Sequence, residues 1–283
     1  MKKQVITEEN IEELDELLPE DIAENIGRSS YQAIAMEEGT ETSAAMVWEY
    51  RYLEDENRDP QSHLSWIIAK DNKAGENLFT EYAKDISEEG IVKSVASFAA
   101  SEAGEMVEIL KAAGFSITEK EVSNIHVTIG DLEKLDVLKK KKTAANLRPL
   151  DDLQVRIFRR GIMNCIFHTK REHLEDLATL PIDWYDTDVS CCVTSDDRID
   201  GFFLVHRLSS GRLRVEFMAA VGPDARIDLI NMIRFSAFRA IEKYPKETEI
   251  ILPRRDESAE KLVGYFFPGA KGEPGIYGER EEK

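Results

Sequence analysis

The pattern of apolar and polar positions predicts alternating strands and helices in the first half of the chain. Apolar runs bounded by turn residues predict strands over 31–36, 43–52, 64–69 and 91–99, and one or two strands over 116–129. Apolar residues spaced by three and four predict a helical stripe over 8–18, a helix that ends at Gly90 and a helix that ends at Gly114. The strand at 64–69 is apolar after Ser65, which indicates a central position in its sheet.

The second half repeats this order after a mainly helical stretch over 153–180. Strands are predicted over 188–194, 201–207, 213–221 and 249–252, and helices over 226–243 and 258–267. The junction between a central strand and the next helix falls at Lys70 and again at Gly222, 152 residues later. Leu110 and Val263, in the later helices, are 153 residues apart. This nearly constant separation indicates a duplicated architecture of two similar mixed α/β domains.

A lysine-rich stretch, LKKKKTAANLRPL, lies between the halves. Charge runs followed by small residues and proline are typical of solvated linkers. The predicted division is therefore a first domain over 1–138, a linker over 139–149 and a second domain over 150–283.

Composition and charge narrow the class of function. The chain has 283 residues, with 55 acidic and 37 basic side chains and a formal net charge of −18. This excess of acids argues against a general binder of nucleic acid or of anionic membranes. The sequence has no apolar run of about 18 residues or more, and MKKQVITEEN lacks the apolar core of a signal peptide. We therefore expect a cytoplasmic protein with neither nucleic-acid nor membrane partners.

Familiar motifs for metals, nucleotides and serine hydrolases are missing from the sequence. It contains no HExxH, no GxxxxGK[ST], no GxGxxG after a strand and no GxSxG. Cys165, Cys191 and Cys192 are odd in number and lack CxxC spacing, which favours reduced thiols over a disulfide framework or a zinc site. No metal is expected.

The stretch KDNKAGENL, which begins at Lys70, joins the predicted central strand to an amphipathic helix. A helix N-terminus offers N–H groups and a partial positive charge, so it can bind a pyrophosphate. Lys73 adds positive charge, and Gly75 allows the backbone to approach a ligand closely. Gly222 and Arg226 occupy the matching stretch, VGPDARIDL, in the second half. An ordinary strand-to-helix connection is the alternative interpretation.

The order of elements resembles the GNAT superfamily of acyl-CoA N-acyltransferases, over nearly the whole chain and twice in tandem. The matching segments are SWIIAKDNKAGENLF, IVKSVASFA and EMVEILKAAGF in the first half, and RVEFMAAVGPDARIDLI and TEIILPRRDESAEKLVGYFF in the second. Against the family pattern [QR]xxGx[GA]xxL, Gly75 and Leu78 match, whereas Lys73 replaces the first glycine. Arg226 and Ile227 replace both glycines in the second half. The resemblance implies two GNAT-like folds, each a mixed, mostly antiparallel sheet flanked by helices.

The resemblance also implies an acetyl-CoA site, which we place in the first domain. The pantetheine arm would pair with the splayed strand end, and the pyrophosphate would meet the loop and the helix start. These positions are Ile67, Ile68, Ala69, Lys70, Lys73, Ala74, Gly75, Glu76 and Asn77. Leu110 and Val263 replace the tyrosine that in this family often protonates the leaving thiolate, although Tyr265 lies nearby in sequence.

Transfer of an acyl group to an amine also needs a base for the amine proton. Glu216 lies between Val215 and Phe217 in a predicted strand, so it faces away from them, and the resemblance implies a base there. In the first domain Leu64 overlays Glu216, and the adjacent His63 is the better base because imidazole titrates near neutrality. Exposed surface roles are the alternative for both residues.

Two functions are left open by the sequence. One is an acetyl-CoA-dependent N-acetyltransferase that acts on a small-molecule or peptide amine. The other is a catalytically degenerate GNAT-fold protein that binds acyl-CoA or another ligand in a regulatory role. A homo-oligomer is compatible with either function.

Overall fold

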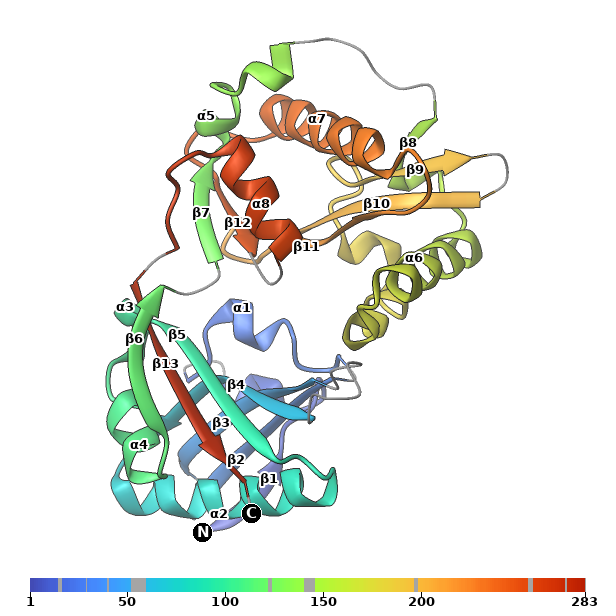
Figure 1. The fold of residues 1–283 in the computed structure, drawn as a ribbon. Coiled ribbons are helices and arrows are strands. Elements are labelled where there is room, and N and C mark those ends of the chain that lie inside the picture. Colours follow the sequence, from blue (N-terminus) through green and yellow to red (C-terminus); the bar gives the residue numbers. More distant parts are fainter. Residues whose placement is uncertain are drawn as a thin grey trace. The chain divides into compact units, whose positions relative to one another are not determined.

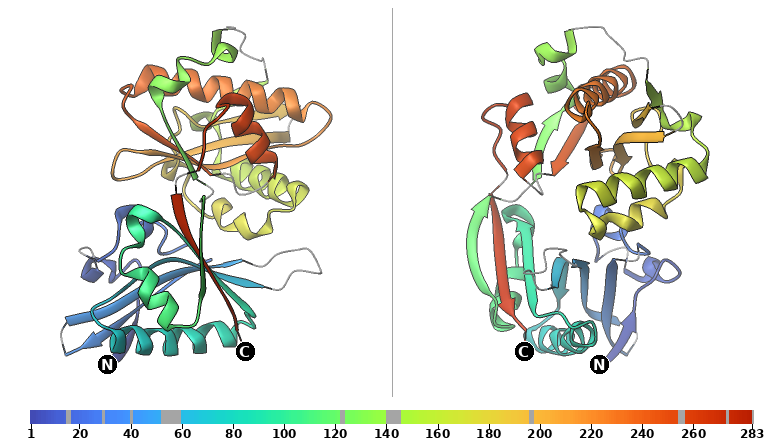
Figure 2. Two further views of the ribbon diagram at one scale, coloured as in Figure 1. Left: turned by 60° about the vertical axis from the view of Figure 1, so that its left-hand side comes forward. Right: turned by 45° about the vertical axis from the view of Figure 1, so that its right-hand side comes forward.

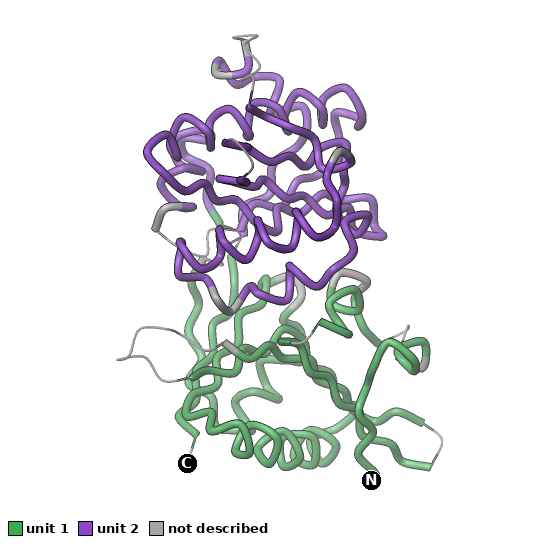
Figure 3. The backbone as a smooth tube through the Cα atoms, turned by 90° about the vertical axis from the view of Figure 1, so that its right-hand side faces the viewer, with its two compact units in different colours: residues 1–122, 272–283 green, residues 123–271 purple. Residues whose placement is uncertain are grey.

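The chain folds into two compact units, residues 1–122 with 272–283 and residues 123–271 (Figure 3). The structure, a computed structural model, describes residues 1–14, 17–28, 30–39, 41–51, 60–121, 124–139, 146–195, 198–253, 257–272 and 274–282. Most of the predicted linker, 140–145, lies outside these residues. The division between the units falls at 122 rather than within 139–149, and the C-terminal segment belongs to the first unit.

The first unit is built on a seven-stranded sheet in the order β1-β2-β3-β4-β5-β13-β6. Its strands are β1 (Lys2–Val5), β2 (Tyr31–Glu38), β3 (Glu41–Arg51), β4 (Gln61–Ala69), β5 (Lys93–Ala99), β6 (Ser116–Glu121) and β13 (Pro274–Glu281). Only the pair β4–β5 is parallel. Helices α2 (Asn72–Glu88), α3 (Ala100–Ala103) and α4 (Met106–Ala112) pack on one face. The segment with η1 (Ile11–Leu14) and α1 (Glu20–Ala23) packs on the other face. Among the described residues of the predicted stripe over 8–18, η1 is the one helical turn.

The second unit has a six-stranded sheet in the order β7-β12-β11-β10-β9-β8. Its strands are β7 (Asn124–Thr128), β8 (Leu147–Pro149), β9 (Cys191–Ser195), β10 (Arg198–Arg207), β11 (Leu213–Ala220) and β12 (Glu249–Pro253). Here the pair β11–β12 is parallel. Helices α7 (Ala225–Lys243) and α8 (Glu257–Phe266) lie on one face, with α5 (Ile129–Leu132) beside α7, and α6 (Val155–Thr169) lies on the other (Figure 2). The predicted mixed α/β class is confirmed in both units.

The two halves of the sequence exchange one strand each. β6 and β7 follow each other along the chain, yet β6 belongs to the first sheet and β7 to the second. β13 returns to the first sheet and lies between β5 and β6, antiparallel to both (Figure 1). β7 takes the same place beside the parallel pair of the second sheet, antiparallel to β12. The strand next to each parallel pair therefore comes from the other half of the sequence, which explains why the division differs from the predicted one.

The strand β13 is hard to recognise in the sequence, because glycine interrupts the alternation of apolar side chains that identifies a strand. A Cβ atom on Gly278 would lie 3.0 Å from Ile117 Cδ1 and 3.3 Å from Phe115 Cδ1. The close approach of these side chains therefore requires glycine here, and glycine within a strand interrupts the apolar pattern.

Removal of residues 272–283 is expected to unfold the first unit and to leave the second unit folded. The deletion takes out a strand that pairs along Gly275–Glu281 with β5 and along Pro274–Glu279 with β6, which opens two sheet edges and the core beneath. Hydrogen exchange followed by mass spectrometry should show lost protection over 61–121 and retained protection over 198–253. Removal of residue 283 alone is the control, because Glu282 still pairs with Arg280 in that variant. Equal protection of both units in the longer truncation would contradict the exchanged topology.

None of the helices in the described ranges has the length and apolar content needed to cross a bilayer.

Candidate functional site

In each unit the two parallel strands separate part-way along their length. β4 and β5 pair from Gln61 to Leu64, after which β4 continues to Ala69 without β5. β11 and β12 pair only at Leu213 and Arg214, and β11 continues to Ala220. One edge of each strand end thus has no strand partner in the described part of the chain. An extended ligand that carries amide groups can pair with such an edge as an added strand does.

A β-bulge lies where the strands separate, and it corrects the overlay of the two halves. On β4, Val47 pairs with Trp66 and Trp48 with Leu64, which leaves Ser65 as the extra residue. On β11, Leu204 pairs with Phe217 and Val205 with Val215, which leaves Glu216 as the extra residue. Glu216 therefore corresponds to Ser65, whereas the sequence overlay matched it with Leu64. Bulges turn a side chain away from the regular alternation of a strand.

Glu216 lies on the face of the second sheet that α6 covers. Leu213 and Val215 pack on the α7 face, so Arg214 between them points to the α6 face. Glu216 forms an ion pair with Arg214 Nε, and its side chain is only 3% exposed. A carboxylate paired with a guanidinium in this way is a strong hydrogen-bond acceptor at a fixed position.

An apolar cavity of about 100 Å³ lies on the opposite face of the same strand. Its walls include Leu213, Val215 and Met218 of β11, Ile250 of β12, Ala237 and Ala240 of α7, and Val263 and Phe266 of α8. Val215 and Met218 lie on either side of the bulge, so the cavity and the Glu216 carboxylate meet at one point of β11 from its two faces. The separated strands, the bulge, the carboxylate and the cavity thus form one candidate site in the second unit.

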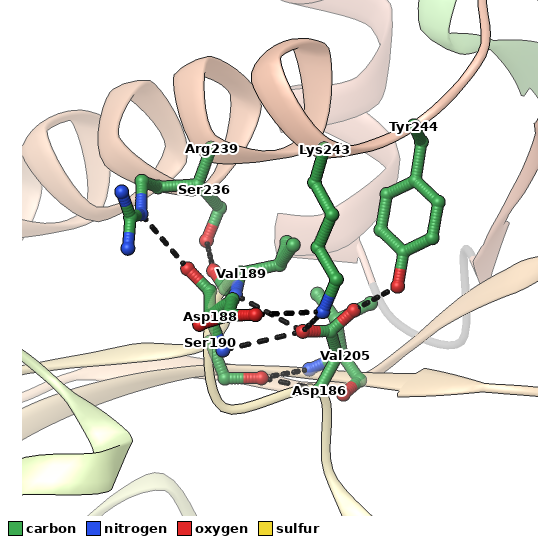
Figure 4. A network of polar contacts seen from close by, with 9 residues as sticks. All are labelled: Asp186, Asp188, Val189, Ser190, Val205, Ser236, Arg239, Lys243 and Tyr244. Carbon is green, nitrogen blue, oxygen red and sulfur yellow. Dashed lines mark hydrogen bonds and ion pairs between the residues drawn. The ribbon is translucent and has the colours of Figure 1, made fainter.

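A partly buried polar network joins α7 to the loop that precedes β9 (Figure 4). The Asp186 carboxylate accepts hydrogen bonds from Lys243 Nζ at 2.8 Å, from the Tyr244 hydroxyl, and from the backbone N–H groups of Asp188 and Val189 at 3.2 and 3.3 Å. Lys243 Nζ also donates to Asp188 at 2.9 Å. These bonds tie the C-terminal end of α7 to the loop that precedes β9.

The middle of α7 is tied to the same loop. The Ser236 hydroxyl donates to the Val189 carbonyl at 2.5 Å, and Arg239 Nε donates to the Asp188 carbonyl at 3.2 Å (Figure 4). Because Ser236 lines the cavity and its hydroxyl is bonded to Val189, the polar atom of this wall is already satisfied.

The network shifts the pKa values of its members. Burial alone would lower the pKa of Lys243, but its hydrogen bonds with Asp186 and Asp188 outweigh burial and raise it. The same contact with Lys243 lowers the pKa of Asp188. Burial, and then the hydrogen bond to Asp186, raises the pKa of Tyr244 to about 12. At neutral pH the network therefore holds a charged Lys243 and a neutral Tyr244.

The start of α2, the predicted pyrophosphate site, is exposed over 71–73 and carries its own carboxylate cap. The N-cap Asp71 carboxylate accepts a hydrogen bond from the Ala74 N–H at 2.8 Å. A Cβ atom on Gly75 would lie 3.4 Å from Ile109 Cγ2 and 3.7 Å from Ala69 Cβ, so α4 packs directly on the helix start. A carboxylate at a helix N-terminus occupies the position that favours an anion, and it repels a phosphate there.

The start of α7 is exposed as well. Gly222 has a φ of +95°, a conformation that favours glycine, and the loop over 222–224 is exposed. Asp224 is the N-cap residue, and its side chain makes no capping hydrogen bond. Arg226 is exposed in the first turn, and burial raises the pKa of Asp228 in the same turn. The helix start of the second unit therefore combines an exposed glycine loop and Arg226 with the two carboxylates of Asp224 and Asp228.

The structure places the nine predicted coenzyme positions at one strand-to-helix junction of the first unit, as expected for neighbours in sequence. Four are buried (Ile67, Ala69, Ala74 and Gly75), two are half-buried (Ile68 and Asn77), and three are exposed (Lys70, Lys73 and Glu76). Lys70 Nζ lies 3.6 Å from Glu41 in an exposed ion pair, and Asn77 Nδ2 contacts Met1 Sδ. These positions stay a prediction.

His63 and Glu216 belong to different units, and the structure adds a residue that sequence reasoning missed. His63 is half-buried on β4 and lies opposite Glu49 of β3. Trp48 and Tyr50 pack on the α2 face, so Glu49 and His63 share the opposite face. Glu49 is 1% exposed. In the sequence, Glu49 could have been noticed as the one acidic residue in the apolar stretch AAMVWEY.

Neither position that replaces the family tyrosine holds a proton donor. Leu110 is fully buried in the first core, and Val263 lines the cavity of the second unit. Tyr265 is 70% exposed and is not among the cavity residues.

Tyr82 is buried in the first unit, where its hydroxyl lies 2.7 Å from both Ser62 Oγ and Ser94 Oγ and burial raises its pKa. It joins the paired part of β4 and β5 to α2.

Within the ranges that the structure describes, no group of three or more His, Cys, Asp or Glu residues could hold a metal ion.

The fold is recognised by similarity to solved structures and not by similarity of sequence. No protein-family model matches the sequence, and no curated protein sequence matches it significantly. The structure is similar to a tandem GNAT protein from the clavulanic acid biosynthesis pathway, with a TM-score of 0.60, 9% identity, and coverage of 100% of this chain and 98% of that one.

Two further structures match over nearly the whole chain. A GCN5-related N-acetyltransferase from Anabaena variabilis has a TM-score of 0.54 and 13% identity, and the match covers 100% of this chain and 73% of that one. One from Kribbella flavida has a TM-score of 0.52 and 12% identity, with coverage of 99% and 71%. The chain has the tandem GNAT fold, with two GNAT-like units in one polypeptide.

Proposed function

We propose that the protein is an acyl-CoA-dependent N-acyltransferase whose second unit carries the active site. One observation carries the proposal: Glu216 lies at the bulge where β11 leaves β12, with an apolar cavity on the other face of the same strand. This arrangement can receive an acyl thioester from the α7 side and an amine from the α6 side.

The reaction would proceed by direct attack of the amine on the thioester. The amine nitrogen forms a bond to the carbonyl carbon while Glu216 accepts the amine proton, directly or through one water molecule. A backbone N–H group on the free edge of β11 would stabilise the negative charge that develops on the carbonyl oxygen. The bond between carbon and sulfur then breaks, and the CoA thiolate leaves and takes a proton from water, because Val263 replaces the family tyrosine.

The pantetheine arm carries two amides, which suits it to the free edge of β11. The pyrophosphate would meet the N–H groups at the start of α7 and the side chain of Arg226. The first unit has the same separated strands, but the Asp71 carboxylate caps its helix start. We assign the first unit to support of the exchanged strands rather than to the chemistry.

A regulatory protein that binds acyl-CoA without turnover is the second candidate function, and the absence of the family tyrosine at Leu110 and Val263 favours it. Incubation with acyl-CoA and a panel of amines, with detection of released CoA thiol, separates the two functions. Release that depends on an amine supports the acyltransferase. Binding without release for every amine class would support the regulatory function instead.

Arg226→Glu is expected to weaken acetyl-CoA binding by roughly tenfold or more, whereas Lys73→Glu should leave it nearly unchanged. The loss of one charge-assisted contact to a phosphate accounts for this magnitude. Isothermal calorimetry on the full chain measures both variants. The two variants are matched, because each reverses one exposed charge in the first turn of the helix that follows a central strand. If Lys73→Glu alone weakened binding, the coenzyme site would lie in the first unit, as the sequence predicts.

A further inference from the structure

The cavity of the second unit has more room than an acetyl group needs. Its volume is about 100 Å³. An apolar cavity of about 150 Å³ in another protein takes up a benzene molecule, so this one can hold roughly three or four carbon atoms. An acetyl group extends beyond its carbonyl by one methyl group.

The walls of the cavity favour a hydrocarbon over water. The side chains that line it are apolar apart from Ser236, whose hydroxyl is bonded to the Val189 carbonyl. A buried water molecule needs two to four polar partners, whereas cavities lined by apolar groups remain dry and accept apolar ligands. An aliphatic chain is therefore the group whose burial here is most favourable.

The cavity also runs in the direction that an acyl chain would take. Val215 and Met218 bring it to the bulge at Glu216, where the thioester carbonyl would lie. Leu213, Ile250 and Ala240 extend it from there toward the paired part of β11 and β12. A chain attached at the bulge would thus lie between the sheet and α7.

We propose that the acyl donor is a short-chain acyl-CoA of about four or five carbons, whose three or four carbons beyond the carbonyl occupy this cavity. This inference rests on the proposed function and names the donor class for the same site. Ala237 and Phe266 line the cavity from α7 and α8, so substitutions there change its volume.

The first test is an affinity series of acetyl-, propionyl-, butyryl-, hexanoyl-, octanoyl- and decanoyl-CoA, measured by calorimetry on the full chain. Affinity should rise about fourfold for each methylene up to butyryl-CoA, and it should stop rising once the cavity is full. Equal affinity along the series would overturn the donor assignment while leaving the proposed function in place. No binding of any acyl-CoA would overturn both.

The second test shifts the length limit in both directions. Ala237→Leu fills the cavity and should remove the gain of butyryl- over acetyl-CoA. Phe266→Leu enlarges the cavity and should move the optimum to a longer chain. Circular dichroism confirms that both variants are folded. If folded variants kept the chain-length profile of the original protein, the chain would lie elsewhere and the inference would be wrong.

Discussion

Glu216→Gln is expected to lower the rate of acyl transfer by roughly 10²–10⁴-fold, the usual contribution of a positioned base. The amide cannot accept the amine proton, but its oxygen still accepts a hydrogen bond from Arg214, so the fold and the cavity should persist. Acyl-CoA affinity should therefore change little. Release of CoA thiol measures the rate, and calorimetry measures the affinity.

His63→Gln is the matched control, since it removes the base predicted for the first unit. It should leave the rate nearly unchanged if the second unit carries the chemistry. A large loss in His63→Gln with none in Glu216→Gln would move the active site to the first unit, where His63 lies opposite the buried Glu49.

Asp186→Ala is expected to lower the free energy of unfolding of the second unit by about 1–3 kcal/mol, the cost of leaving hydrogen-bond donors without their acceptor at a partly buried position. The Asp186 side chain is 2% exposed, and it accepts hydrogen bonds from Lys243, Tyr244 and two backbone N–H groups. Without it, Lys243 keeps only its bond to Asp188, and the two N–H groups lose their side-chain acceptor. Urea denaturation, followed by hydrogen exchange in 198–253, measures the effect.

Asp188→Ala is the control for that experiment. Its side chain is 53% exposed and shares the same lysine, so its removal should cost about 1 kcal/mol or less. Equal losses in the two variants would show that the buried position of Asp186 contributes nothing. Because Ser236, Ala237 and Ala240 line the cavity from α7, Asp186→Ala should also flatten the dependence of affinity on acyl chain length.

Elements that bury one face by themselves were predictable from the sequence. Helices α2 and α7 have apolar residues that recur with the helical period, so their positions were visible without a structure. The central strands β4 and β11 were predictable from apolar runs that end at turn residues. The nearly constant separation between the two strand-to-helix junctions indicated the duplication. The GNAT resemblance followed from this order, and the structure confirms the fold that it implied.

Elements that depend on distant partners were not predictable. The exchange of strands depends on which sheet β7 and β13 join. The sequence of β13, eight residues with glycines at 275 and 278, does not indicate that it pairs with β5 and β6. The surroundings of the predicted coenzyme loop were not predictable either. Only the structure shows that the Asp71 carboxylate accepts a hydrogen bond from the Ala74 N–H and that Ile109 packs on Gly75.

The sequence by itself determined the local elements, their order and the two strand-to-helix junctions, because periodicity and turn chemistry act over a few residues. Only the tertiary structure decided that Asp71 caps the helix after Lys70, and that a buried carboxylate and a cavity lie on the two faces of β11. Cavities, ion pairs and strand partners arise from residues far apart along the chain, so their geometry exists only once the sheets have formed.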